Sequence, residues 1–213
     1  MPDEFIELPD PTSSDGWREA MARLMPGADE EDLQAASDQI RGQLPPPSDD
    51  GSGILNAMCV GTEEVDGDER LSMGLLSVSI MGSEHHDRLM TAEGIYRAKT
   101  TKFFKGESNL QELDFELGKG LQGQQDMVLA AKLPCGPGAM SVSMRSLTLP
   151  AGDSATTPFA IPVAALQLII PAPRDYCVYI TIATPSVHLL DSYCHRLAHI
   201  GRTFAFDVQD GPS

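Results

Sequence analysis

The chain has 213 residues, of which 41% are hydrophobic, so it can bury the core of one domain of ordinary to large size with an N-terminal extension. Its formal net charge of −16 disfavours nucleic acid and anionic lipid as partners, because both are polyanions. No run approaches the roughly 20 apolar residues of a membrane-spanning helix, and residues 1–10 lack the basic and apolar regions of a secretory signal, so we expect a cytoplasmic protein.

The acidity is concentrated in the N-terminal third of the chain. Residues 1–70 carry 18 acidic and 4 basic side chains, whereas residues 71–213 carry 13 and 11. A field of this sign speeds the encounter with a basic surface, within a screening length of about 8 Å at physiological ionic strength. We therefore expect the partner to be another protein with a basic surface.

Residues 1–50 are expected to form an acidic helical arm with its linker. A short strand is expected over residues 5–9, and apolar residues at helical spacing predict helices over residues 17–25 and 29–44. The Pro-, Ser- and Gly-rich run 45–53 is a linker by composition. One interpretation is that the arm is solvated on one face and packed on the other. The alternative is that it docks a basic partner, with its apolar stripes making the contact. The stripes comprise Trp17, Met21 and Leu24 in the first helix, and Leu33, Ala36, Ile40 and Leu44 in the second.

Residues 54–208 are expected to form one α+β domain with a mainly antiparallel sheet, because alternating β-branched segments are joined by hairpin-length turns. Asp66-Gly67 favours a two-residue hairpin turn. A helix is expected over residues 88–105. This is the one basic segment, and it is either a solvated face or a contact for an anion, a partner or the acidic arm. The expected strands cover residues 54–61, 71–82, 110–117, 127–133, 140–149, 159–170 and 176–184.

The C-terminal stretch predicts a β-β-α-β unit of packed helix and sheet. After strands 159–170 and 176–184, a helix begins near Thr184 or Ser186, Gly201 ends it, and residues 203–208 form a closing strand. The strand 176–184 places Val178, Ile180 and Ile182 on one face, and the helix packs inward the stripe Val187, Leu190, Cys194, Leu197 and Ala198. On this assignment, Ile180→Asp and Leu190→Asp unfold the protein, whereas Tyr193→Ala leaves the fold largely intact.

The sequence lacks the spacing patterns of serine hydrolases, zinc proteases, dinucleotide-binding proteins and EF-hands. The glycine-rich run 118–123 has no GKS or GKT ending, so it is predicted as a hairpin tip rather than a phosphate loop. The cysteines at positions 59, 135, 177 and 194 form no CxxC pair, which favours free thiols. We therefore expect no cofactor and no enzymatic activity.

One constellation of metal-ligand types stands out on the C-terminal helix. His188, Asp191, His195 and His199 follow one another at intervals of three, four and four residues, which places them in one band away from the apolar stripe. His195 and His199 are one turn apart, a spacing that suits two imidazoles on one divalent ion. The four residues span roughly 16 Å of helix, so they cannot all share one ion. The alternative is a polar solvent face or a His-rich contact surface.

The tail FAIPVAALQLIIPAP…CVYITIATPSVHLLDSYCHRLAHIGRTFAF resembles actinobacterial proteins of unassigned function whose layout is similar to the PsbP-like α/β/α sandwich. The resemblance covers about residues 54–207, while the acidic arm before residue 50 and a strand after the last helix depart from that layout. Members of that superfamily are mostly non-enzymatic adaptors, assembly factors or effector chaperones. The resemblance thus implies a binding module, although a shared fold is weak ground for a shared function.

The sequence is therefore compatible with three functions. The first is a cytoplasmic adaptor or chaperone-like module that binds another protein. The second is a structural subunit of a homo- or hetero-oligomeric assembly. The third is a metal-dependent enzyme that uses His188, Asp191, His195 and His199.

Overall fold

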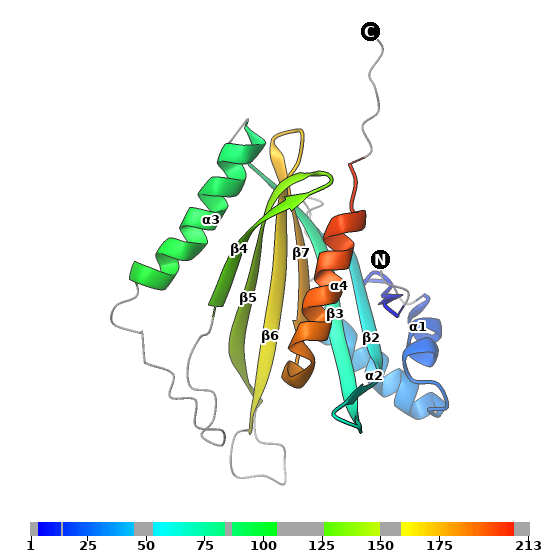
Figure 1. Cartoon of the computed structure of the whole chain (residues 1–213). Coiled ribbons are helices and arrows are strands. Elements are labelled where there is room, and N and C mark those ends of the chain that lie inside the picture. The colour runs from blue at the N-terminus through cyan, green and yellow to red at the C-terminus, as the bar shows by residue number, and fades with distance from the viewer. Residues whose placement is uncertain are drawn as a thin grey trace.

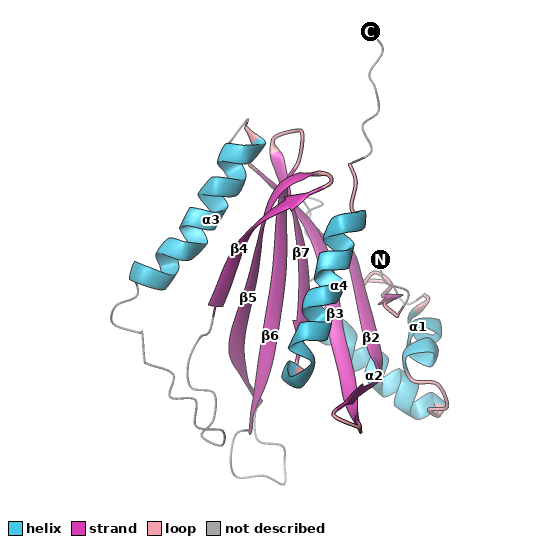
Figure 2. Ribbon diagram, viewed as in Figure 1, coloured by secondary structure: helices cyan, strands magenta, loops and turns pink. Residues whose placement is uncertain are grey.

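The computed structural model describes residues 4–13, 15–44, 53–83, 87–105, 126–149 and 159–206. Its seven strands form one antiparallel sheet in the order β1-β2-β3-β7-β6-β5-β4 (Figures 1 and 2). This confirms the predicted α+β fold with a mainly antiparallel sheet. The strands are β1 (Ile6–Glu7), β2 (Gly53–Val65), β3 (Asp68–Gly82), β4 (Asp126–Leu133), β5 (Gly136–Leu149), β6 (Phe159–Pro171) and β7 (Tyr176–Thr184). The helices are α1 (Trp17–Leu24), α2 (Glu30–Gln43), α3 (Arg88–Lys105), the 3-10 turn η1 (Val187–Leu189) and α4 (Leu190–Thr203).

One face of the sheet carries the main core and is covered by α4, which lies in front of the sheet in Figure 1. The alternation of β7 places Val178, Ile180 and Ile182 on this face with exposures of 3%, 1% and 0%, as the sequence predicted. Leu166 and Leu168 of the neighbouring strand β6 join them in the same core. The central strands are therefore fixed by apolar burial on this side.

The opposite face carries helices at both edges of the sheet. The packed stripe of α1 and α2 lies over β2 and β3, where it contacts Met58, Val60 and Leu75. At the other edge, α3 packs against β4, β5 and β6. Helices therefore flank the sheet on both sides, and no helix within the described ranges is long and apolar enough to cross a membrane.

The N-terminal helices form where the sequence predicted them. Asp29 caps α2, since its carboxylate accepts a hydrogen bond from the Asp32 amide at 3.0 Å. Trp17 and Leu24 of α1 are only 2% and 3% exposed, so the apolar stripes of the arm are already covered by the sheet. They are not available to a partner, which excludes the predicted use of these stripes as the contact surface.

The β2–β3 hairpin is closed by the predicted two-residue turn. Asp66 and Gly67 have φ angles of 55° and 86°, the positive values that a type I′ turn requires. This turn sets the register, which pairs Val65 with Asp68 and Glu64 with Glu69. The strands therefore run longer toward the turn than the predicted segments 54–61 and 71–82.

The C-terminal helix differs from its prediction in phase. The stripe that α4 buries runs through Tyr193, Leu197 and Ile200, while Leu190 and Cys194 are half-buried beside it. Tyr193 has no exposed surface at all, so the expectation that Tyr193→Ala leaves the fold largely intact is wrong. The 3-10 turn at η1 has about 3.0 residues per turn, which changes the phase at which α4 begins.

The end of α4 also differs from its prediction. Gly201 lies inside α4, because the helix continues to Thr203. A Cβ at Gly201 would lie 2.8 Å from Leu168 Cδ2, so the glycine permits close packing of α4 on β6. Residues 204–206 form no strand, and the predicted closing strand is therefore absent up to residue 206. Its last two residues, 207 and 208, lie outside the described ranges, as does the predicted strand 110–117.

Candidate functional site

The four predicted metal ligands lie on the outer side of η1 and α4. His188, Asp191, His195 and His199 are all exposed. His195 Nδ1 is 2.7 Å from the Asp191 carbonyl oxygen, which can only accept, so this nitrogen is the donor of the contact. Within the part of the chain that the structure describes, no three His, Cys, Asp or Glu side chains are grouped to hold an ion. Metal binding by His195 and His199 stays a prediction.

A polar cluster that the sequence did not indicate lies between α4 and the β2–β3 side of the sheet. Arg196 donates to Glu4 Oε1 at 2.7 Å, to Glu63 Oε1 at 2.8 Å and to Ser192 Oγ at 2.8 Å. Ser192 in turn donates to Glu63 Oε2 at 2.6 Å. This single guanidinium therefore joins the N-terminal segment, β2 and α4.

Tyr193 extends the cluster into the core. Its hydroxyl lies 2.9 Å from Ser72 Oγ and 3.7 Å from Cys59 Sγ, and the Arg196 guanidinium stacks 4.7 Å from its ring. The ring also lies against Gly74, where a Cβ would be only 2.6 Å from Tyr193 Cε1. Gly74 is therefore the residue that makes room for the ring in β3.

The protonation states in this cluster fit a structural role. Burial raises the pKa of Tyr193 to about 12, against the opposing effect of the Ser72 hydrogen bond, so the phenol stays neutral near pH 7. Partial burial alone would raise the pKa of Glu63, but hydrogen bonds from Ser192, Ser72 and Arg196 lower it. Glu63 is therefore a carboxylate held in place by its donors, and the cluster clamps α4 onto the sheet.

The basic helix α3 makes a second polar contact with the sheet. Lys99 Nζ donates to Ser141 Oγ at 2.8 Å and to Gln167 Oε1 at 2.9 Å, and Gln167 continues to Thr181 Oγ1 at 3.2 Å. Lys99 thus positions α3 on the sheet, whereas Arg97 makes an exposed ion pair with Glu93.

The N-terminal acidity is displayed on a fixed surface. We call this surface the acidic face: the exposed acidic side chains that α1, α2 and the β2–β3 hairpin present at one edge of the sheet. Its members are Glu19, Glu30, Glu31, Asp32, Asp38, Glu64, Asp66, Asp68 and Glu69. Three of them are paired, Glu30 with Arg18, Asp38 with Arg41 and Asp68 with Arg70, and contribute less to the field. Because α1 is anchored through buried Trp17, Met21 and Leu24, and α2 packs Leu33 and Ile40 against the same cluster, the charges keep their positions relative to the sheet.

The hairpin contains an unfavourable charge pair. Glu64 and Glu69 are directly opposite each other in the β2–β3 register, and both are exposed. The next pair toward the sheet, Glu63 and Arg70, has opposite charges. Like charges at directly opposite positions of a hairpin are destabilising. The Asp66-Gly67 turn fixes this register, so the pair could have been found from the sequence.

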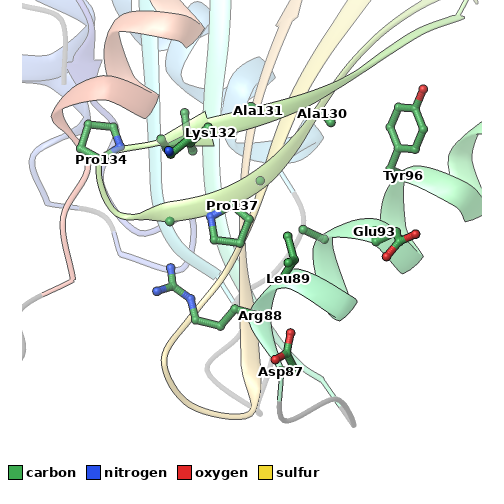
Figure 3. Close-up of a pocket in the computed structure, with 14 residues that line it drawn as sticks. Asp87, Arg88, Leu89, Glu93, Tyr96, Ala130, Ala131, Lys132, Pro134 and Pro137 are labelled. Carbon is green, nitrogen blue, oxygen red and sulfur yellow. The ribbon is translucent and has the colours of Figure 1, made fainter.

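A groove of about 1100 Å³ lies at the other edge of the sheet, between α3 and the β4–β5 hairpin (Figure 3). Its α3 wall includes Leu89, Ala92 and Tyr96, and its hairpin wall includes Ala130 and Pro137. Figure 3 shows the α3 side chains and those of the hairpin on opposite sides of the opening. The sequence prediction missed this groove, because its walls come from segments that are distant in the chain.

Comparison with known proteins gives no match to a family model, to a curated protein or to a solved structure. The resemblance to the PsbP-like superfamily therefore stays a prediction. The function has to be inferred from the surfaces of the chain itself.

Proposed function

We propose that the chain is a non-enzymatic cytoplasmic binding module, an adaptor or chaperone-like protein, whose acidic face captures another protein through a basic surface. The observation that carries the proposal is the Glu64–Glu69 pair, two exposed acidic residues at directly opposite positions of the β2–β3 register, where like charges are expected to repel each other. A lysine or arginine of a partner placed between them would remove that repulsion. Binding would then be favoured by pairing and by relief of the existing strain.

The rest of the acidic face supports the same reading. Glu31 and Asp32 are exposed in the first turn of α2, which is anchored on β2 and β3. A fixed set of like charges raises the rate of encounter with an oppositely charged surface more than it raises affinity. By contrast, Glu4 and Glu63 are already paired with Arg196 and contribute less to this field.

The test is the double substitution Glu64→Gln/Glu69→Gln. It is expected to raise the free energy of unfolding, because the repulsion between the two carboxylates is removed. It is also expected to reduce capture of the partner. The readouts are urea unfolding and quantitative affinity purification from native cells at low and high salt.

Two control variants separate charge from other effects. Glu64→Asp/Glu69→Asp keeps both charges and should keep capture. Asp191→Asn removes an exposed charge on the opposite face of the sheet and should also keep capture. If the double Gln variant captures the same proteins in the same amounts as the unaltered chain, the acidic face is not the binding surface.

A further inference from the structure

The outer edge of β4 is open within the described ranges. β4 is the last strand of the sheet and pairs only with β5 there. In an antiparallel pair, the backbone groups of alternate residues point away from the partner strand. Among the described residues, no strand pairs with the outer N–H and C=O groups of Asp126–Leu133, so this edge can serve as a template for another strand.

Both faces of this edge are apolar. On the α4 side of the sheet, Met127 and Leu129 are 49% and 48% exposed. On the α3 side, Ala130 borders the groove, and Leu89 of α3 is 66% exposed at the rim. A strand added beside β4 would therefore find apolar contacts for the side chains on each of its faces, as in recognition by strand addition.

The charged residues around the groove indicate what kind of ligand it can bind. Asp87 is engaged, since its carboxylate accepts from the Met90 amide at 2.8 Å and caps α3. Arg88 donates to the carbonyl oxygens of Pro171 and Cys135. Glu93 is paired with Arg97.

Lys132 is different from these three charged residues. It is exposed, it lines the groove, and it makes no hydrogen bond or ion pair within the described part of the chain. Its ammonium group lies on the hairpin wall, beside Pro134 in Figure 3. An apolar groove with one uncompensated cation fits an apolar segment that carries a carboxylate.

We propose that the β4 edge binds an extended segment of another protein as an added strand, with apolar side chains against the groove and a carboxylate on Lys132. This site lies at the opposite end of the sheet from the acidic face and has the opposite charge preference. The two surfaces would let one molecule hold two partners. The proposal does not depend on the acidic face, so the two can fail separately.

The binding test uses defined peptides as probes. They are fluorescein-labelled eight-residue peptides of alternating valine and threonine, with one aspartate or one lysine scanned through the valine positions so that the charge lies on the same face as the remaining valines, and anisotropy gives their affinity for the full chain. The best aspartate peptide is expected to bind roughly two- to fivefold more tightly than its lysine counterpart, the range for an exposed ion pair. Lys132→Glu should reverse this preference. Arg23→Glu makes the same charge change on exposed α1, at the far edge of the sheet, and should leave the preference unchanged.

Hydrogen exchange provides the geometric readout. Added peptide should protect alternate amides of Asp126–Leu133, and N-methylation of alternate peptide amides should abolish binding. Equal binding of the aspartate and lysine peptides, or protection on α4 instead of β4, would overturn the proposal. It is also overturned if the β4 amides are protected without peptide, because the edge is then already occupied, by a second copy if light scattering shows a dimer and by another segment of the same chain if it shows a monomer.

Discussion

Gly74→Ala is expected to destabilise the protein through one side chain, Tyr193. The added Cβ would lie 2.6 Å from Tyr193 Cε1, about 1 Å inside the usual contact distance of carbon atoms. The ring cannot swing aside freely, because its hydroxyl is held by Ser72 at 2.9 Å and the whole side chain is buried. Overpacking of this kind costs about 1–3 kcal/mol.

An opposing effect has to be included in the magnitude. Alanine in place of glycine restricts the unfolded chain and stabilises by about 0.4–1 kcal/mol where the site has room. Gly74→Ala should therefore cost roughly 0–2.6 kcal/mol with Tyr193 present and should become stabilising without the ring. Tyr193→Ala alone should cost about 3–5 kcal/mol, a large part of the 5–15 kcal/mol typical of a domain. Tyr193→Leu is the better partner substitution, since it keeps more of the apolar volume.

The assay is a double-mutant cycle by urea unfolding. The single tryptophan, Trp17, reports on the packing of α1, and circular dichroism reports on the whole sheet. The coupling between Gly74→Ala and Tyr193→Leu should be roughly 1–3 kcal/mol, with the loss caused by Gly74→Ala disappearing in the Tyr193→Leu background. Additive losses would show that the ring and Gly74 are not in contact.

Three further outcomes are expected. Ile180→Asp should unfold the protein, because Ile180 is 1% exposed and an unpaired carboxylate there costs several kcal/mol. Leu190→Asp should cost less, because Leu190 is half-buried. Equal melting temperatures for Ile180→Asp and the unaltered chain would refute the core assignment. The pKa of Glu63 is lowered in the folded protein, so its carboxylate adds stability that is fully present above the ordinary pKa of 4.5 and is lost as the pH falls through the folded-state pKa. The difference in unfolding free energy between the unaltered chain and Glu63→Gln should therefore close in acid. A difference that does not change with pH would count against the Arg196 clamp. If His195 and His199 bind a metal ion, calorimetric titration with Zn²⁺ should give binding heat with the unaltered chain and none with His199→Gln. Absence of binding heat with the unaltered chain would show that these histidines form a polar surface and not a zinc site.

The sequence was sufficient for features that depend on local patterns. The alternation of 176–184, the Asp66-Gly67 turn and the helix predicted over residues 29–44 each depend on neighbouring residues, and the structure contains all three. The antiparallel class followed from short turns between strands. Local chemistry decides such features, so no knowledge of distant contacts was needed.

The phase of α4 could not be obtained in this way. Leu190 and Tyr193 are both apolar enough to face a core, and the choice between them depends on Gly74, a residue of a distant strand that leaves space for a ring. The clamp formed by Arg196 with Glu4 and Glu63 depends on equally distant segments. Neither arrangement has a sequence spacing that would reveal it.

The two candidate binding surfaces also differ in whether the sequence could predict them. The Glu64–Glu69 opposition follows from the turn and was within reach of the sequence. The groove between α3 and β4 was not, because its walls meet only after the sheet has formed. Of the two interpretations of the arm, the packed one agrees with the structure, since the stripe of α1 is buried and Leu33, Ala36 and Ile40 of α2 are half-buried in the same cluster as Met58, Val60 and Leu75.

The proposed role of the acidic face is to capture a basic partner protein. Its most direct test is the association rate constant of the purified partner, measured across a range of salt concentrations with the unaltered chain and with Glu64→Gln/Glu69→Gln. We predict a rate that falls as salt rises for the unaltered chain, and a slower rate with a shallower salt dependence for the variant. Identical rates and identical salt dependence in the two proteins would contradict the claim.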